Sequence, residues 1–291
     1  MKTQFLKVRI RVSSPRWYVI AALFLLSFLA SSVLLAADEK VSGRLIVEDV
    51  LARPSTPVML QARLVQDGPG GATGVGGETI EFVVQGQRVG TTLTDKDGHA
   101  SLEFKTHMRG NQKIVAKVES SAKVTAKPGI GNFASWERRK PILLVDVVTL
   151  LKSEEGAVFS AFNTAKLGEP DVDAPYELTK LGEFYYNIIY VLRGNEGDVE
   201  RLRDWLKAAN FPPGITREVQ SGSAQLLAFI EQLKEGGWDH VEAGIGQTKG
   251  FADTLVKNRI KAVIFPDPSK NEKFPRRAKI VSTWKEVRKH L

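Results

Sequence analysis

The pattern of apolar and polar positions changes near residue 140. Between residues 41 and 126, short apolar runs that alternate or cluster with a period of two are separated by turn residues. From residue 140 onwards, apolar runs of strand length alternate with stretches of helical period. The first pattern predicts an all-β sandwich over residues 41–126. The second predicts an α/β domain over residues 140–291, with a doubly wound parallel sheet.

Individual elements follow from these patterns. Strands of the sandwich are predicted at 45–47, 58–64, 79–84, 100–104 and 113–118. In the α/β domain, strands are predicted at 142–145, 186–192, 241–244 and 262–265, and helices at 176–185, 197–209, 224–235 and 251–258. The glycine-rich stretch 68–77 lacks the Lys-Ser/Thr ending of a phosphate-binding loop and precedes a strand, so we interpret it as a flexible loop.

The sequence predicts that residues 127–139 form a linker between the two domains. Pro128, Gly129 and Gly131 interrupt regular structure, and Phe133 and Trp136 are expected to pin the linker onto the domain that follows.

The N-terminus predicts a membrane helix. Residues 1–16 carry five basic side chains and no acidic one, and residues 17–37 are uncharged and apolar over a length that spans a bilayer as a helix. The basic end is expected to stay in the cytoplasm, which places the folded domains on the periplasmic side of a bacterial inner membrane, with a single span. We favour an uncleaved anchor; the alternative is a signal peptide whose removal yields a secreted or periplasmic protein.

Composition excludes several classes of function. The 291 residues carry a net charge of +8, but the basic residues gather at the two ends of the chain and no aromatic platform accompanies them, so nucleic-acid binding is not expected. The absence of cysteine removes disulfides and thiolate chemistry, and the four histidines lack the spacing of metal ligands. We therefore predict no metal site and no cofactor.

The sandwich region resembles bacterial immunoglobulin-like domains of the invasin and intimin kind. Two segments carry this resemblance, 77–82 and 89–100. It implies a spacer or adhesive module without chemistry of its own. Asp95, Asp97 and His99 could form an incipient metal site, but Asp-x-Asp-Gly is also what a tight hairpin turn requires, and we favour the turn.

One carboxylate occupies a position typical of α/β active sites. Asp146 follows the buried run 142–145, and ligands of parallel sheets bind beyond the carboxyl ends of the strands. An aspartate there is either a nucleophile or a residue that caps a turn or helix.

The α/β region resembles the lipin-like branch of the haloacid dehalogenase (HAD) superfamily of phosphatases. The segments that carry the resemblance are 133–136, 140–146, 188–193, 203–214 and 244–248. It implies a Mg²⁺-dependent mechanism in which the carboxylate at Asp146 forms an aspartyl-phosphate.

This chain departs from the pattern of that family at most of its site. The acid/base aspartate falls on Val148, the phosphate-gripping hydroxyl on Leu192, and the metal-binding Gly-Asp on Gly246 and Gln247. The cation of the third motif is also missing, because residues 220–229 contain no Lys or Arg. Since acid/base catalysis alone supplies about 10²–10⁴-fold, we expect a pseudoenzyme in which Asp146 is a vestigial nucleophile. Mg²⁺ is implied only by the alternative, a phosphatase of phosphomonoesters, including phospholipid-related ones.

In a second interpretation, the crevice at the carboxyl ends of the strands still binds a ligand but has no catalytic activity. Arg193, Gly246, Thr248 and Lys249 are candidates for binding an anion, because the segment that holds the last three lies between a strand and a helix N-terminus. The alternative is turn geometry inherited from a phosphatase ancestor.

The expected function is non-catalytic binding or scaffolding at the cell envelope. The partners are the membrane, through residues 17–37, and an envelope protein or lipid of unknown identity. Adhesion through the immunoglobulin-like domain is a further alternative. The sequence leaves open whether Asp239 or Asp253 replaces a lost site carboxylate.

Overall fold

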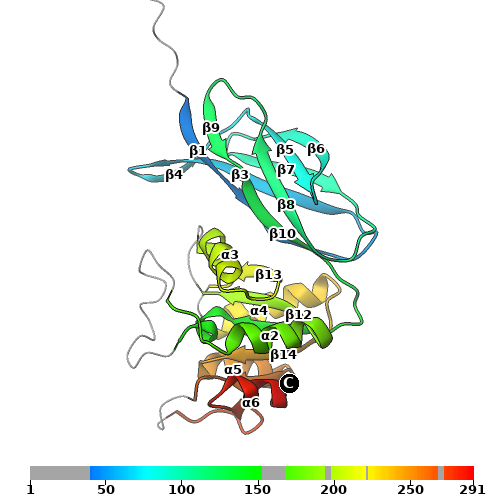
Figure 1. Cartoon of the computed structure of the whole chain (residues 1–291), viewed down its shortest axis with the longest axis vertical. Helices are drawn as coiled ribbons and strands as arrows, with labels where there is room; N and C mark the ends of the chain where they lie inside the picture. The colour runs from blue at the N-terminus through cyan, green and yellow to red at the C-terminus, as the bar shows by residue number, and fades with distance from the viewer. Residues whose placement is uncertain (1–39, 153–167, 194–197, 221, 268–271) are drawn as a thin grey trace, which may run out of the picture. The chain divides into compact units, whose positions relative to one another are not determined.

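Two β-sheets form the N-terminal half of the described chain. A computed structural model describes residues 40–152, 168–193, 198–220, 222–267 and 272–291. The strands are β1 (Val41–Val47), β2 (Val50–Ala52), β3 (Val58–Gly68), β4 (Gly71–Gly74), β5 (Thr79–Val84), β6 (Gln87–Leu93), β7 (His99–Phe104), β8 (Gly110–Val118), β9 (Val124–Lys127) and β10 (Gly129–Ser135). One sheet has the order β4-β3-β1-β9 with β7 also paired to β3, and the other has the order β2-β10-β8-β5-β6 (Figure 1).

Alternating side chains explain why these strands enclose a core. Along β3, Leu60, Ala62 and Leu64 are buried, while the intervening Met59 and Gln61 are exposed. Each fully buried side chain of leucine size contributes about 1.5–3 kcal/mol through the hydrophobic effect. An edge-on contact between Phe104 and Phe133, with ring centroids 5.6 Å apart, joins the two sheets. The sequence-based prediction of a β-sandwich is therefore correct.

The predicted linker at 127–139 is wrong for most of its length, because residues 129–135 form strand β10. This strand pairs antiparallel with β8 from Gly129 to Ser135. The glycines do not break structure but permit close packing: a Cβ on Gly129 would lie 2.4 Å from the carbonyl oxygen of Leu45, and one on Gly131 would lie 2.8 Å from Val47. The sandwich thus extends to Ser135, beyond the predicted boundary at residue 126.

The glycine-rich stretch 68–77 is also more ordered than predicted. Strand β4 forms a hairpin with β3, and a Cβ on Gly74 would lie 2.1 Å from the carbonyl oxygen of Asp97. Glycine is needed at this position because two backbones approach each other there.

The turn at Asp95 forms as the sequence predicts. Oδ1 of Asp95 accepts hydrogen bonds from the backbone N–H groups of His99 and Asp97, each at 2.9 Å, and Gly98 has a φ of +81°. These bonds, the one from His99 above all, hold the pKa of Asp95 below its usual value. No group of three potential metal ligands occurs among the residues that the structure describes.

A six-stranded parallel sheet forms the C-terminal half. Its elements are β11 (Ile142–Asp146), η1 (Val147–Leu150), α2 (Ala174–Phe184), β12 (Asn187–Leu192), α3 (Asp198–Ala208), β13 (Ile215–Glu218), α4 (Ser223–Glu235), β14 (Val241–Gly246), α5 (Lys249–Lys257), β15 (Lys261–Ile264), β16 (Lys279–Ile280) and α6 (Trp284–His290). The strand order is β13-β12-β11-β14-β15-β16, and every neighbouring pair is parallel.

Helices cover both faces of this sheet (Figure 1). Leu143 and Val145 pack with side chains of α2, α3 and α6, while Ile142 and Leu144 pack with side chains of α4 and α5. The four predicted strands and four predicted helices of this half are all present, within a few residues of their predicted ends. Strands β13 and β16, of four and two residues, were not predicted because runs this short carry no periodicity.

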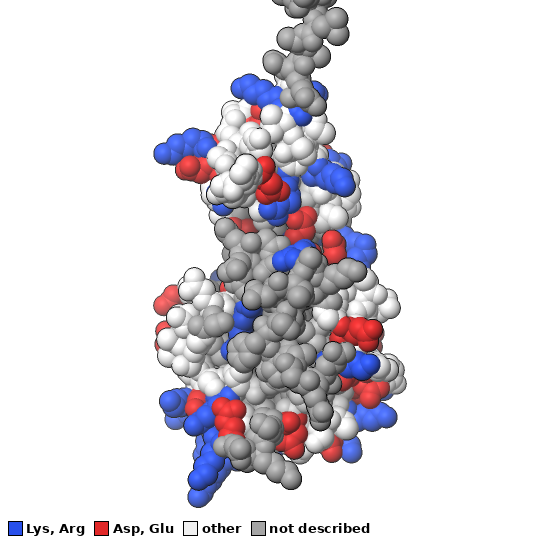
Figure 2. Space-filling view, turned by 90° about the vertical axis from the view of Figure 1, so that its left-hand side faces the viewer, with Lys and Arg blue, Asp and Glu red and all other residues white. Residues whose placement is uncertain are grey.

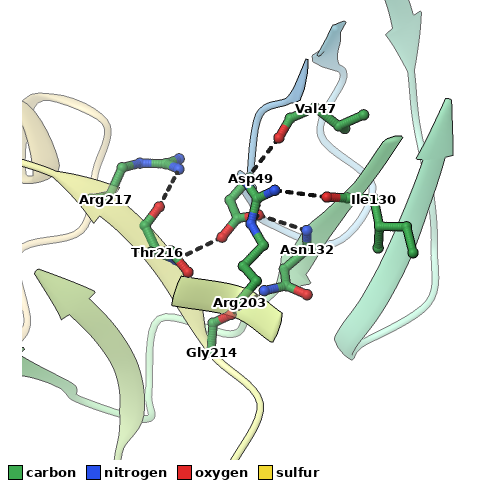
Figure 3. A network of polar contacts seen from close by, with 8 residues as sticks. All are labelled: Val47, Asp49, Ile130, Asn132, Arg203, Gly214, Thr216 and Arg217. Carbon is green, nitrogen blue, oxygen red and sulfur yellow. Dashed lines mark hydrogen bonds and ion pairs between the residues drawn. The ribbon is translucent and has the colours of Figure 1, made fainter. Parts of the chain in front are cut away.

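A buried carboxylate joins the sandwich to the α/β half (Figure 3). Asp49, between β1 and β2, has a fully buried side chain that forms an ion pair with Arg203 of α3 at 2.9 Å. It also accepts hydrogen bonds from the backbone N–H groups of Asn132 in β10 and Thr216 in β13, both at 2.7 Å.

The guanidinium of Arg203 completes this network. It donates to the carbonyl oxygens of Ile130 at 2.7 Å and Val47 at 2.8 Å, both in the sandwich. Nearby, the side-chain amide of Asn132 donates to the carbonyl oxygen of Gly214 at 3.1 Å. Charged and polar groups from both halves thus pair with one another in a largely buried place.

The two halves also share an apolar core. Ala134 and Trp136, at the end of the sandwich, pack in the same cluster as α4 and α5, and the indole of Trp136 meets that of Trp238 edge-on at 6.3 Å. Residues 42–121 and 125–291 accordingly form one compact unit. The expectation that Trp136 pins the chain onto the following domain is confirmed, whereas Phe133 is buried in the sandwich.

The predicted membrane span lies outside the described residues, as does the basic segment 1–16. Within the described part of the chain, no helix is long and apolar enough to cross a membrane.

The buried Asp49–Arg203 pair predicts that replacing Asp49 lowers the free energy of unfolding much more than replacing an exposed aspartate does. Asp49→Ala leaves the buried guanidinium of Arg203 without its counter-charge, and it is expected to lower the free energy of unfolding by about 3–5 kcal/mol. Asp67→Ala breaks an exposed pair with Arg44 and is expected to cost about 1 kcal/mol or less. Urea unfolding of the two variants measures both values; equal losses would contradict this role of Asp49.

Candidate functional site

The candidate site lies where the strand order of the parallel sheet reverses. Counted from β11 as the first strand, the order is 3-2-1-4-5-6, so the chain turns to opposite sides on leaving β11 and β14. Ligands of doubly wound sheets bind outside the carboxyl ends of the strands at this switch point. Asp146 ends β11 and Gly246 ends β14, so both lie at this position.

Asp146 is held by its own chain and by one arginine. It is the N-cap of the short 3₁₀ helix η1, and its Oδ1 accepts a hydrogen bond from the backbone N–H of Val148 at 3.4 Å. The hydroxyl of Thr149 donates to the backbone carbonyl of Asp146 at 2.7 Å. On the other side, Nη2 of Arg193 lies 3.1 Å from Oδ2 of Asp146. The capping function that sequence analysis weighed against the nucleophile is therefore present.

Burial changes the ionisation of Asp146. Only 1% of the residue is exposed, and this desolvation raises the pKa of its carboxyl to about 6, although Arg193 and the N–H of Val148 act in the opposite direction. A carboxyl with this pKa is mostly charged at neutral pH and gains a proton under mildly acidic conditions.

Arg193, the ion-pair partner of Asp146, also contacts an aromatic ring. Its guanidinium lies 5.8 Å from the ring centroid of Phe251, in the first turn of α5, in a cation–π contact. Arg193 and Asp146 are thus the two candidate residues that the structure brings together, and each neutralises the other.

The glycines of β14 make room for the same ring. A Cβ on Gly246 would lie 2.2 Å from the side chain of Phe251, and one on Gly244 would lie 2.5 Å from that of Leu255. Gly246 therefore allows α5 to pack closely on the sheet. This packing role is a structural reason for the glycine that the anion-binding hypothesis did not consider.

The other two anion-binding candidates lie at the start of α5. The hydroxyl of Thr248 accepts a hydrogen bond from the backbone N–H of Phe251 at 3.3 Å, so Thr248 is the N-cap of the helix. Lys249 is exposed, and the structure gives no contact that joins it to Arg193 or Asp146 within the described ranges.

Neither substitute carboxylate joins Asp146 in a metal site. Asp239 precedes β14, at the end of the parallel sheet opposite to Asp146, and forms an ion pair with Arg138. Asp253 lies on α5, and no group of three potential metal ligands forms among the described residues.

The described residues do not fit a magnesium site. Mg²⁺ needs hard oxygen ligands, usually one or two carboxylates supplemented by waters and substrate oxygens. Here the carboxylate of Asp146 is paired with a guanidinium, which repels a second cation at the same oxygens. No described residue near Asp146 supplies the second carboxylate that the phosphatase pattern has two positions later, where Val148 stands.

Sequence reasoning missed the partners that define this site. The ring of Phe251 links Arg193 to Gly246, and the signal that could have indicated it was the pair Gly244 and Gly246 on a buried strand beside an aromatic residue at a helix start. Asp49 and Arg203 were missed because nothing in a local pattern joins residues 154 positions apart.

Charge on the described surface is mixed. On the face shown in Figure 2, Lys and Arg side chains lie among Asp and Glu side chains, with one basic group at the lower end. Exposed basic residues of the C-terminal segment include Lys273, Arg276, Arg277, Lys279 and Lys285.

Comparison with known proteins gives only distant similarities. No protein-family model matches the chain, and no curated protein is significantly similar to it. The fibronectin(III)-like modules of Clostridium thermocellum CbhA share 17% identity over 34% of this chain and 49% of that chain, with a TM-score of 0.25. The CARDB domain of PF1109 from Pyrococcus furiosus shares 15% identity over 33% and 90%, with a TM-score of 0.23. The D0-D1 domain of intimin shares 18% identity over 32% and 46%, with a TM-score of 0.21.

All three similarities are to fibronectin-like, CARDB or intimin domains. The matches span less than half of the CbhA and intimin chains, and their TM-scores are too low to carry an argument about activity. The fold itself defines the class: a β-sandwich joined through a buried polar contact to a doubly wound α/β domain.

The raised pKa of Asp146 predicts a pH-dependent effect of Asp146→Asn. The folded carboxyl titrates at about 6, above its usual 3.8, so its contribution to stability is full below about pH 4 and is lost as the pH rises through about 6. The free energy of unfolding of the wild type minus that of Asp146→Asn should therefore fall over this window, by about 3 kcal/mol in order of magnitude.

Urea unfolding between pH 4 and pH 8 measures this difference. Asp95→Asn is the control of opposite sign, because hydrogen bonds lower the pKa of Asp95 and its contribution is lost as the pH falls. A difference for Asp146→Asn that stays constant or rises with pH would contradict the buried, destabilised carboxylate.

Proposed function

We propose that this chain is a non-catalytic protein of the bacterial cell envelope, anchored in the inner membrane, whose α/β half is a HAD-like pseudophosphatase domain used for binding or scaffolding. The folded part lies on the periplasmic side in this proposal, with residues 17–37 as the anchor. The β-sandwich is an immunoglobulin-like domain that presents the α/β half at a distance from the membrane.

One observation carries the non-catalytic part of the proposal. The carboxylate at the position of a nucleophile is buried, caps η1 and is ion-paired with Arg193. An aspartyl-phosphate mechanism needs this carboxylate to attack a dianionic phosphate beside a metal ion. A guanidinium in contact with both carboxylate and Phe251 occupies the carboxylate in a different interaction.

The strand order supports the HAD-like assignment. The resemblance to HAD phosphatases implies a nucleophile at the end of the first strand of the parallel sheet. Asp146 lies at that end of β11, beside the switch point. The competing function is a Mg²⁺-dependent phosphatase acting through Asp146. Its one favourable observation is the same placement of Asp146.

Hydrolysis and magnesium binding discriminate the two functions. In the full-length protein, we expect no Mg²⁺ binding by isothermal titration calorimetry in the millimolar range, and no hydrolysis of p-nitrophenyl phosphate above the level of Asp146→Asn. Asp239→Asn is the matched control, because Asp239 is exposed and lies at the opposite end of the sheet. Mg²⁺-dependent hydrolysis that Asp146→Asn abolishes and Asp239→Asn retains would overturn the proposal in favour of the phosphatase.

A further inference from the structure

A second candidate site lies at the other end of the parallel sheet, away from Asp146. A groove of about 560 Å³ is lined by the end of β2, the turn between β7 and β8, and the segment that leads from β10 into β11. The residues that matter for its chemistry are Arg53, Arg109, Trp136, Glu137, Arg138 and Arg139. Since the last four precede β11, the groove lies on the amino-terminal side of the sheet.

The charge of this groove is unbalanced. Arg109 forms an ion pair with Glu137 at 2.6 Å, and Arg138 forms one with Asp239. Arg53 and Arg139 are exposed, and neither side chain has an ion pair or hydrogen bond within the described part of the chain. Two uncompensated guanidinium groups therefore line the same groove.

The guanidinium of Arg53 lies beside the turn that precedes β14. A Cβ built on Gly237, in the turn before β14, would lie 3.5 Å from Nη1 of Arg53, and Gly237 has a φ of +81°. The positive φ, rather than a lack of space, favours glycine at this position. The side chain of Arg53, from the sandwich, therefore lies close to the α/β half.

The floor of the groove is rigid and apolar. Trp136 is 3% exposed, its indole N–H donates to the side-chain oxygen of Asn111 at 2.9 Å, and its ring packs against Trp238. Its backbone N–H donates to the carbonyl oxygen of Ala52 at 2.9 Å, which fixes the segment 136–139 next to Arg53. The guanidinium groups are therefore carried by a well-anchored stretch of chain.

The geometry points to a binding site for a phosphate-bearing ligand, with Arg53 and Arg139 as the phosphate-binding side chains. Guanidinium groups bind phosphate oxygens through paired, charge-assisted hydrogen bonds, and two of them match a group that carries two negative charges. The groove is larger than one phosphate, so it also has room for an organic or polymeric part of the ligand. Such a phosphate can belong to a lipid headgroup or to a soluble or polymeric polyphosphate.

This site is independent of the proposed pseudophosphatase crevice. It uses none of the residues around Asp146, so it can bind phosphate whether or not that crevice is catalytic. It also gives the proposed binding function a location, where Arg53 from the sandwich and Arg139 from the segment that leads into β11 line one groove.

Titration calorimetry of the full-length protein in detergent tests the site. The probes are inorganic phosphate, pyrophosphate and dihexanoyl phosphatidic acid below its micelle concentration, each in about 50 mM salt to limit screening. Arg53→Gln combined with Arg139→Gln is expected to weaken the best-bound probe at least tenfold. Arg276→Gln combined with Arg277→Gln removes the same charge from two exposed arginines elsewhere and is expected to change the affinity less than threefold.

The results distinguish a lipid ligand from a polyphosphate ligand, and they also show whether the proposed site exists. Tighter binding of the lipid probe than of pyrophosphate assigns the site to a headgroup, and the reverse assigns it to a polyphosphate. Retained affinity in the Arg53/Arg139 variant, equal losses in the two double variants, or no binding of any probe by the wild type would overturn the site. None of these results depends on Asp146→Asn, so failure here leaves the pseudophosphatase proposal to its own test.

Discussion

The junction between the two halves of the chain depends on one carboxylate that is completely buried. The side chain of Asp49 is fully buried, and moving an ion of that size out of water costs several kcal/mol unless other groups compensate it. The compensation comes from both halves of the chain: Arg203 and the N–H of Thr216 from the α/β half, and the N–H of Asn132 from the sandwich. Separating the halves would break the two contacts that Asp49 makes with the α/β half, those with Arg203 and with the N–H of Thr216. The sandwich and the α/β domain therefore act as one structural unit and not as modules on a flexible linker.

Burial also determines the state of Asp146 at the switch point. A carboxylate that is to act as a nucleophile on phosphate must be accessible and must share its surroundings with a metal ion, whereas Asp146 is buried, caps η1 through Oδ1 and is ion-paired with Arg193. Arg193 in turn rests on Phe251, and Phe251 fits against the sheet because Gly246 has no side chain. A cation is thus part of the packing around the carboxylate of Asp146. Guanidinium groups without a counter-charge are found instead at Arg53 and Arg139, near the opposite end of the parallel sheet.

Much of the fold could be predicted from local patterns, because alternation and apolar runs report burial directly. The strands β3, β5, β11 and β14 and the helices α2 to α5 were predicted for that reason. The linker was predicted wrongly because Gly129 and Gly131 were read as breakers, although they serve close strand packing, which only the neighbouring chain reveals. At the candidate site, Asp146 and Arg193 were identified from their positions at strand ends, but their mutual contact was not. The Asp49 network could not be found at all, since Asp49 stands between two short strands and its partners are spread from Asn132 to Thr216.

The central claim, that the two halves form one cooperative unit, is tested most directly by native-state hydrogen–deuterium exchange of the full-length protein. The amides of β8, in the centre of its sandwich sheet, are compared with those of β11, in the centre of the parallel sheet. If the buried Asp49 network couples the halves, the slowest amides of both strands exchange with the same free energy of opening, within about 1 kcal/mol. Amides of β11 that remain protected by about 3 kcal/mol more than those of β8, or the reverse, would mean that one half opens alone, and this would contradict the account.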